Sequence, residues 1–413
     1  MGPGNAKKPA HLVVIGGGTA GVGLIASLKK RVKNLNITLI EPNENHFYQP
    51  AWTLVGAGLY HNSRTARPLA KVIPAETRWI QEYVASVSPE QHAVTTQSGR
   101  VIDYDYLVIA SGIVLRWDRI AGLEETLGRN GVTSNYQPGL AAYTWELVKE
   151  LKSGNAIFSQ PKPPFKCAGA PQKALYLSCE HWQKTGRLND INVSFNLAGE
   201  AIFSVPYFIP VLKSYLDSYT ATVTCSSSLV KVDGEKRIAT FHITEPGQPD
   251  RHVEQRFDML HVVPPQTSPD FIAKSGLANV DGWCDVHSTT LQHQKYPDIF
   301  SLGDCCSAPA SKTAAAARKQ IVVVAENLRN VMQGKEPASH YDGYGSCPLT
   351  VKRGKVVLAE YGYNNRLLPT FPLEPSHPSR LAWFLTTRFL PVFYWRGLLK
   401  GVEWFARSKQ PDR

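Results

Sequence analysis

The chain has 413 residues, of which 43% are hydrophobic and 19% charged, and its formal net charge is +11. This length predicts two or three domains with ample core, and the composition is that of a globular protein. The charge favours anionic partners, but without a basic block or zinc-finger spacing we expect no nucleic-acid binding and no metal site. The seven cysteines are an odd number and the first ten residues lack the apolar stretch of a secretory signal, so we expect no framework of structural disulfides.

The N-terminal segment predicts a dinucleotide site. The apolar run 12–15 predicts a buried parallel strand, 22–32 predicts a helix, and a Gly-x-Gly-x-x-Gly pattern lies between them. Such glycines let the chain turn tightly and let backbone approach a pyrophosphate, and an acid after the second strand (37–40), here Glu41, suits the ribose hydroxyls. A glycine-rich loop alone often only turns the chain. The combination of strand, glycine motif, helix, second strand and terminal acid is specific for a dinucleotide site. The expected contacts are Gly16, Gly18, Thr19, Ala20, Gly21 and Glu41.

A small β-insert is expected to interrupt the first domain. Its predicted strands are 78–80, 83–87, 94–99 and 101–104, with a turn at Ser98-Gly99. Another buried strand is predicted at 106–110 and ends in Ser111-Gly112. In flavoproteins with two dinucleotide-binding domains, which this pattern resembles, the equivalent strand ends in Ala-Thr-Gly and the insert offers backbone to the adenine. That resemblance makes Ala110, Gly112 and Val84 candidate cofactor contacts.

A second α/β unit begins at 155–158, where a nicotinamide site would need its own glycine fingerprint. Prolines at 161, 163, 164 and 171 stand there instead, so no pyrophosphate loop of the usual kind is expected. This argues against NADH or NADPH as electron donor. Strands at 193–196 and 221–224 and a helix at 205–216 are predicted to complete the unit.

The chain is predicted to return to the first domain through an apolar strand that ends in Gly303-Asp304, followed by a long helix from 311 to 332. Gly303-Asp304 alone could be an ordinary turn. Together with the N-terminal motif it predicts a second FAD contact, because an acid at a strand end beside a helix N-terminus suits a flavin. The expected contacts are Asp304, Lys312, Thr313 and Ala314.

The segment 379–407 alternates large aromatic and basic residues and has too many charges for a membrane span. It suits helices that lie in an anionic interface, with Pro391 expected to split the segment in two. The alternative is a helix packed on the protein's own core or on a second copy in a homodimer.

Two cysteines are candidates for redox chemistry. Cys167 lies beside Lys166 in a turn rich in Pro, Gly and Ala, with Lys173 shortly after it, and a nearby ammonium lowers a thiol pKa. Cys347 lies in a turn of its own. The other cysteines are expected to be packing residues: Cys179, Cys225, Cys284 and the vicinal pair Cys305-Cys306.

Four longer strings resemble the sulfide:quinone oxidoreductase family, in the branch that includes the mitochondrial enzymes. They are 46–58, 166–173, 311–316 and 341–349. The resemblance implies non-covalent FAD, oxidation of sulfide to sulfane sulfur, and a membrane quinone as electron acceptor. It adds Gln49 as a cofactor contact. With the predicted elements, it indicates an α/β protein with two Rossmann-like dinucleotide-binding domains: an FAD-binding domain at 1–115 and 265–335, a second domain at 116–264, and a C-terminal membrane-binding region at 336–413.

The resemblance also assigns roles to residues. Cys167 and Cys347 match the family's redox pair and are expected to form a disulfide in the resting enzyme. Sulfide would open this disulfide, leaving a persulfide on Cys347 and a thiolate on Cys167. Lys173 would stabilise that thiolate. Glutathione, sulfite or more sulfide would remove the sulfur. No cysteine lies between Gly21 and Cys167, so we expect no covalent flavin. Tyr361 and Phe371 are candidate quinone contacts.

Several alternatives stay open at this point. A type II NADH:quinone oxidoreductase shares the fold, a flavocytochrome-type sulfide dehydrogenase shares the chemistry, and a redox-inactive membrane-bound FAD scaffold would share the cofactor. We expect a peripheral, monotopic protein on the cytoplasmic face of a bacterial inner membrane or on the mitochondrial inner membrane.

Overall fold

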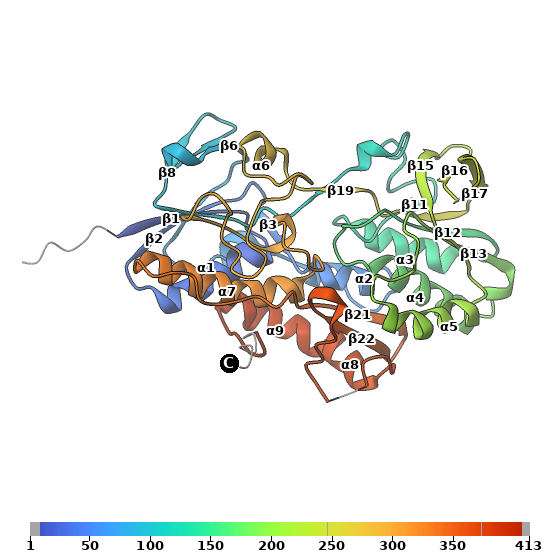
Figure 1. Ribbon diagram of the computed structural model, residues 1–413. Coiled ribbons are helices and arrows are strands. Elements are labelled where there is room, and N and C mark those ends of the chain that lie inside the picture. The colour runs from blue at the N-terminus through green and yellow to red at the C-terminus, as the bar shows by residue number, and fades with distance from the viewer. Residues whose placement is uncertain (1–8, 246, 373, 407–413) are drawn as a thin grey trace, which may run out of the picture.

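The computed structural model describes residues 9–245, 247–372 and 374–406 (Figure 1). The N-terminal unit is built on a parallel sheet of five strands in the order β20-β9-β1-β2-β5. These strands are β1 (Ala10–Ile15), β2 (Leu35–Ile40), β5 (Thr77–Ile80), β9 (Tyr106–Ile109) and β20 (Ile299–Ser301). Apolar side chains alternate between the two faces of the sheet, so both faces need a cover.

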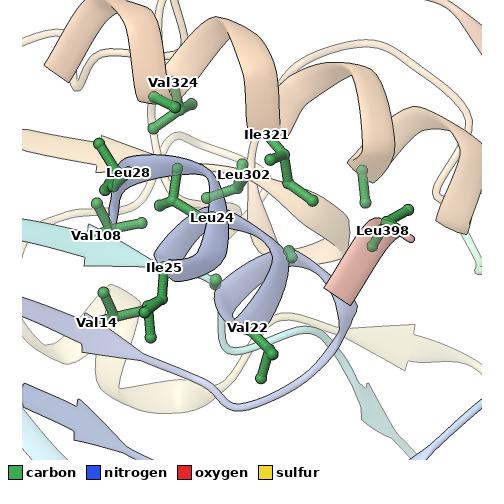
Figure 2. Packing of buried hydrophobic residues seen from close by; sticks show 14 of the residues in the cluster. Val14, Val22, Leu24, Ile25, Leu28, Val108, Leu302, Ile321, Val324 and Leu398 are labelled. Atoms are coloured by element: carbon green, nitrogen blue, oxygen red, sulfur yellow. The ribbon is translucent and has the colours of Figure 1, made fainter. Parts of the chain in front are cut away.

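Helices cover one face of this sheet and an antiparallel insert covers the other. The covering elements are α1 (Thr19–Arg31), α7 (Ala314–Met332), β6 (Val84–Ser88), β7 (Ala93–Thr96) and β8 (Val101–Asp103). Val14 and Val108 share a core cluster with α1 and α7 (Figure 2). Val13 and Ile15, which point the opposite way, share a cluster with the insert. The hairpin predicted at 94–104 is confirmed.

One predicted insert strand belongs elsewhere. Residues 78–80 lie in β5, which pairs in parallel with β2 at the edge of the main sheet. Ile80 is buried in the same cluster as Ile40. Short apolar strands look alike in sequence, and long-range packing decides which sheet they join.

The second unit repeats this plan. Its parallel sheet has the order β11-β18-β12-β13-β14. The strands are β11 (Val132–Thr133), β12 (Gly154–Gln160), β13 (Ile191–Leu197), β14 (Thr222–Thr224) and β18 (Met259–His261). The helices are α3 (Leu140–Glu150), α4 (Ala170–Lys184) and α5 (Ile209–Ser218). An antiparallel sheet packs on residues of the other face: β15 (Ser227–Asp233), β16 (Ile238–Ile243) and β17 (Arg251–Arg256).

The two units are joined where β10 (Val114–Leu115) pairs with β19 (Gln266–Thr267). Smaller elements are β3 (Asn45–Phe47), α2 (Trp52–Val55), β4 (Ala66–Pro68) and α6 (Asp270–Lys274).

The C-terminal region contacts both units, as its red ribbon shows in Figure 1. The hairpin of β21 (Gly345–Lys352) and β22 (Lys355–Tyr361) packs on α4 of the second unit. The helices α8 (Arg380–Phe384) and α9 (Leu390–Arg396) follow. Tyr394, Trp395 and Leu398 are buried in the core of the first unit. The C-terminal region therefore bridges the two units.

Pro391 does not split this segment. Five π-helical residues, Leu385–Phe389, connect α8 directly to α9. Pro391 is the second residue of α9 and directly follows this π-helical turn. Among the described residues, no helix is long and apolar enough to cross a membrane.

Candidate active site

The turn between β1 and α1 forms a cradle for phosphate groups. A Cβ atom on Gly16 would collide with the carbonyl of Ala110, and one on Gly21 would collide with the carbonyl of Gly16. Next to Gly18, by contrast, there is open space. The N-terminus of α1 has no side-chain cap, so its N–H groups are available to a ligand. The arrangement fits the pyrophosphate of FAD.

Glu41 lies at the margin of this cradle, whereas Val84 does not line the cavity next to it. The Glu41 carboxylate accepts hydrogen bonds from the backbone N–H of Gly17 at 2.7 Å and of Asn43 at 2.8 Å. Glu41 therefore fixes the glycine loop from the end of β2. Val84 begins β6 and packs against the cluster under the sheet.

A cavity of about 350 Å³ extends from the glycine loop to the C-terminal helices. Ten of the predicted cofactor contacts line it: Gly18, Thr19, Ala20, Gln49, Ala110, Gly112, Asp304, Lys312, Thr313 and Ala314. The cavity wall also carries buried polar atoms with no hydrogen-bond partner among the described residues, namely both amide atoms of Asn135 and the indole nitrogen of Trp52. Such atoms call for a polar ligand, so the cavity fits FAD.

The second FAD motif lies where β20 meets α7. Lys312 donates to the carbonyl oxygen of Asp304 at 2.6 Å, and its ammonium lies 3.6 Å from the ring centre of Trp283. Burial raises the pKa of Asp304, although the charges of Lys312 and Lys166 oppose this. Thr313 caps α7, and the positive end of this helix would stabilise negative charge on a bound flavin.

The fold brings the two candidate cysteines together although 179 residues separate them in the chain. Cys167 lies in the loop before α4 and Cys347 lies on β21, and the two free thiols are hydrogen-bonded. Gly169 makes this approach possible, because a Cβ atom there would lie only 2.5 Å from Sγ of Cys347. Cys167 has a positive φ of 50°, a strained conformation that its N–H bond to the carbonyl of Lys312 (2.9 Å) helps to hold.

The two thiols differ in acidity. The hydrogen bond from Cys347 lowers the pKa of Cys167; burial opposes this, and the charges of Lys173 and Lys166 support it. The same hydrogen bond raises the pKa of Cys347, as does burial. Cys167 is therefore the thiolate of the pair and Cys347 its proton donor.

Two lysines lie next to this pair. Burial disfavours the charged form of Lys173, but the charges of Cys167 and Cys347 outweigh it and raise the pKa of the lysine. Lys166 donates to Oε1 of Gln49 at 2.6 Å, and burial lowers its pKa to about 8. Lys173 therefore stays charged, whereas Lys166 titrates closer to neutral pH.

Sequence reasoning did not assign roles to several residues of this wall. Lys166 was noted only as the basic neighbour of Cys167, and its hydrogen bond to Gln49 was not expected. Tyr136, whose hydroxyl donates to the carbonyl oxygens of Lys166 (3.0 Å) and Cys167 (3.2 Å), comes with Asn135 from the loop after β11. That loop carries no motif, so its role could not be read from the sequence.

The far end of the cavity is aromatic. Phe371 lines it, together with Leu385, Phe389, Phe393, Trp404 and Phe405. Tyr361, the other candidate quinone contact, does not line it. Its ring packs in the core of the second unit, and its hydroxyl is 2.5 Å from Oγ of Ser311.

The C-terminal helix also reaches the glycine loop. The hydroxyl of Tyr394 lies 2.6 Å from Nε2 of His46 and 2.7 Å from Oγ1 of Thr19. Burial lowers the pKa of His46 to about 4, so the ring is neutral. Because Nδ1 lies 2.8 Å from the carbonyl of Gly17, it carries the proton, and Nε2 accepts from Tyr394. α9 is thus part of the cofactor site.

Comparisons with known proteins agree with this architecture. A family model described as "Pyridine nucleotide-disulphide oxidoreductase" matches residues 10–175. The chain is 39% identical over 397 residues to the mitochondrial sulfide:quinone oxidoreductase of Mus musculus, covering 96% of this chain and 88% of that protein. It is 38% identical over 405 residues to the protein of the same name from Dictyostelium discoideum, covering 97% and 88%.

A solved structure has the same fold. The X-ray structure of the sulfide:quinone oxidoreductase from Aquifex aeolicus superposes with a TM-score of 0.79 at 21% identity, covering 95% of this chain and 92% of that one. Because the two relatives above are 39% and 38% identical to this chain over nearly its whole length, the chain belongs to the sulfide:quinone oxidoreductase family.

Proposed function

We propose that this chain oxidises sulfide to sulfane sulfur at the Cys167–Cys347 pair, with FAD as its cofactor and a membrane quinone as electron acceptor. The observation that carries the proposal is the contact between two unequally acidic thiols on the wall of the cavity that fits FAD. A buried ammonium beside the more acidic thiol completes the site.

The acidity difference sets the direction of the first step. Starting from a Cys167–Cys347 disulfide, hydrosulfide attacks Sγ of Cys347, the S–S bond breaks, and Cys167 leaves as a thiolate. Cys167 is the better leaving group because its pKa is lowered and Lys173 lies 3.4 Å away. Cys347 then carries a persulfide. The electrons of the broken bond now reside on Cys167.

A second nucleophile closes the cycle. A thiol such as glutathione, or sulfite, takes the outer sulfur from Cys347 and leaves a second thiolate. Re-formation of the disulfide releases two electrons, and FAD, when bound in the cavity, would supply the route by which they reach quinone. Lys173 balances the negative charge while both thiolates are present.

The quinone is placed at the aromatic end of the cavity. Phe371, Phe389 and Phe393 line this end, and Phe384 and Val392 on the same segment are more than half exposed. Exposed apolar side chains beside Arg380, Arg388 and Arg396 suit a membrane surface with anionic lipid. We propose a peripheral protein of the mitochondrial inner membrane or of a bacterial inner membrane that takes quinone from the bilayer.

Rapid mixing with sulfide tests the proposal. Excess sulfide, which also serves as the acceptor of the outer sulfur, should bleach the flavin of the holoenzyme, and Cys167→Ser and Cys347→Ser should each abolish bleaching. Cys225→Ser is the matched control, because Cys225 is partly buried in the second unit and far in sequence from the pair. Bleaching that survives either serine substitution at the pair would contradict the cysteine mechanism.

Rapid mixing with NADH tests the type II NADH:quinone oxidoreductase alternative. After β12 the chain continues with prolines at 161, 163 and 164, where a nicotinamide site has a glycine turn. NADH should therefore leave the flavin oxidised. Rapid bleaching by NADH would favour the alternative.

A further inference from the structure

Glu360 is a buried acid that the sulfide chemistry does not use. It lies on β22, is 4% exposed, and lines the same cavity as Phe371 and Phe389. A carboxyl group on the wall of an otherwise aromatic chamber is costly to desolvate unless it is hydrogen-bonded. Glu360 pairs across the hairpin with Ser346, the neighbour of Cys347, but its side chain is hydrogen-bonded to Tyr344 and Thr370, so it calls for a separate explanation.

A hydrogen-bond network connects this carboxyl group towards solvent. Oε2 of Glu360 accepts from the backbone N–H of Thr370 at 2.9 Å, and Oε1 lies 2.5 Å from the Thr370 hydroxyl. The hydroxyl of Tyr344 also donates to Oε1 and lies 3.3 Å from that of Thr370. Thr370 is partly exposed, so this residue lies between the buried carboxyl group and the protein surface.

Other charged and polar side chains lie around Glu360. Arg318 lines the cavity, and the ammonium of Lys319 lies 4.0 Å from the ring centre of Tyr344 and 3.4 Å from Oδ2 of Asp342. Burial lowers the pKa of Lys319, while attraction to Asp342 and Glu360 opposes that shift. Burial, with the charge of Glu360, raises the pKa of Tyr344, so this hydroxyl stays a donor.

Quinone reduction needs such a group. Forming a quinol takes two electrons and two protons, and a reduced flavin supplies both electrons with one proton as a hydride equivalent. The second proton must come from elsewhere. We propose that the Glu360 carboxyl group donates this proton to a quinone oxygen, and that the resulting carboxylate is reprotonated from water through the Thr370 hydroxyl. This inference rests on the proposed placement of the quinone.

The test bypasses sulfide. Holoenzyme reduced with dithionite is mixed with decylubiquinone, and flavin reoxidation is followed across neutral and alkaline pH. Glu360→Gln keeps the size and polarity of the side chain but cannot donate the proton, so reoxidation should slow about a hundredfold. Glu360→Asp, which keeps a carboxyl group, should retain an intermediate rate. Glu235→Gln, an exposed position in the turn between β15 and β16, should behave as the unaltered enzyme.

Two further readouts separate proton donation from a structural role. A quinone-site inhibitor should quench protein fluorescence with unchanged affinity in Glu360→Gln. Infrared difference spectra between the oxidised and reduced forms should lose a carboxylic-acid carbonyl band in that variant. Unchanged reoxidation in Glu360→Gln, equal loss in Glu360→Asp, or loss of inhibitor binding would overturn the inference. Sulfide bleaching, measured separately, tests only the proposed function.

Discussion

The ammonium of Lys173 lies 3.4 Å from Sγ of Cys167 in a site from which water is largely excluded, since Lys173 is only 7% exposed. At this distance the lysine stabilises the thiolate both as a charge and as a hydrogen-bond donor. The sequence separation of six residues places Lys173 in the first turns of α4, immediately after the strained loop that carries Cys167.

Replacing this lysine should raise the pKa of Cys167. A hydrogen bond to a charged group contributes about 1.5–3 kcal/mol, so Lys173→Gln should shift the thiol by about one to two pKa units. In the unaltered protein the lowered pKa keeps Cys167 ionised until the pH falls to that pKa. In Lys173→Gln the pKa of Cys167 is higher, so its thiolate should be protonated at a higher pH. Thiolate absorbance of the reduced protein, titrated with pH, measures the shift. Lys213→Gln, an exposed ion-pair lysine on α5, is the control, and equal titrations would contradict the role of Lys173.

Gly169→Ala should separate the two sulfur atoms. Its new Cβ would lie 2.5 Å from Sγ of Cys347 and would also collide with Leu349, so β21 would have to move. We expect sulfide bleaching to fall at least about tenfold while FAD remains bound, because a displacement near 1 Å at reacting atoms costs rates of this order or more. Gly199→Ala, where the nearest contact would be 3.8 Å, should have no effect. Full bleaching in Gly169→Ala would show that close approach of the sulfurs is not required.

Tyr394→Phe should weaken retention of FAD. The lost hydroxyl ties α9 to Thr19 and His46 at the cofactor loop, and a hydrogen bond of this kind contributes about 1 kcal/mol. A fall in FAD affinity of roughly fivefold is expected, measured by flavin fluorescence during reconstitution. Tyr83→Phe, at an exposed tyrosine, is the control. Unchanged affinity would mean that the helix does not support the cofactor.

Because Tyr394 contacts the cofactor loop, trimming the chain from Ser379 would remove this contact as well as the aromatic segment.

Acidic substitutions on the C-terminal segment should release the protein from vesicles. Phe384 and Val392 are 56% and 55% exposed, and Phe384→Glu with Val392→Glu removes apolar area and adds repulsion from anionic lipid. We expect a several-fold loss of sedimentation with anionic vesicles and no change in sulfide bleaching. Val280→Glu, at a fully exposed valine outside this segment, is the control. Equal sedimentation of all three proteins would contradict membrane binding through this surface.

Local patterns predicted the framework of the fold well. The strand at 12–15 and the glycine turn behind it were predictable because apolar β-branched runs and glycines act through neighbouring residues. The strands at 155–158 and 193–196 were predictable for the same reason. The edge position of β5 was not, because the partner of a short strand is set by packing across the whole sheet. Likewise, the π-helical residues before Pro391 carry no signal of their own in the sequence.

The residues of the site were likewise predictable where they depend on local sequence and not where they depend on long-range packing. The cavity positions built from backbone, such as Gly18 and the start of α7, were predictable from motif geometry. Cys167 and Cys347 could be paired only through resemblance to a family, since nothing local brings a loop before α4 to a distant hairpin. Asn135 and Glu360 gave no signal, because their roles come only from the cavity that the folded units form between them.

The position of the sulfur after a single turnover tests the central claim most directly. Holoenzyme is mixed with one equivalent of sulfide without an acceptor, quenched with an alkylating agent, and analysed by peptide mass spectrometry. The account predicts one added sulfur on Cys347 and an alkylated, unmodified thiol at Cys167, because the more acidic thiol leaves. Added sulfur on Cys167, or bleaching of the flavin with neither cysteine modified, would contradict it.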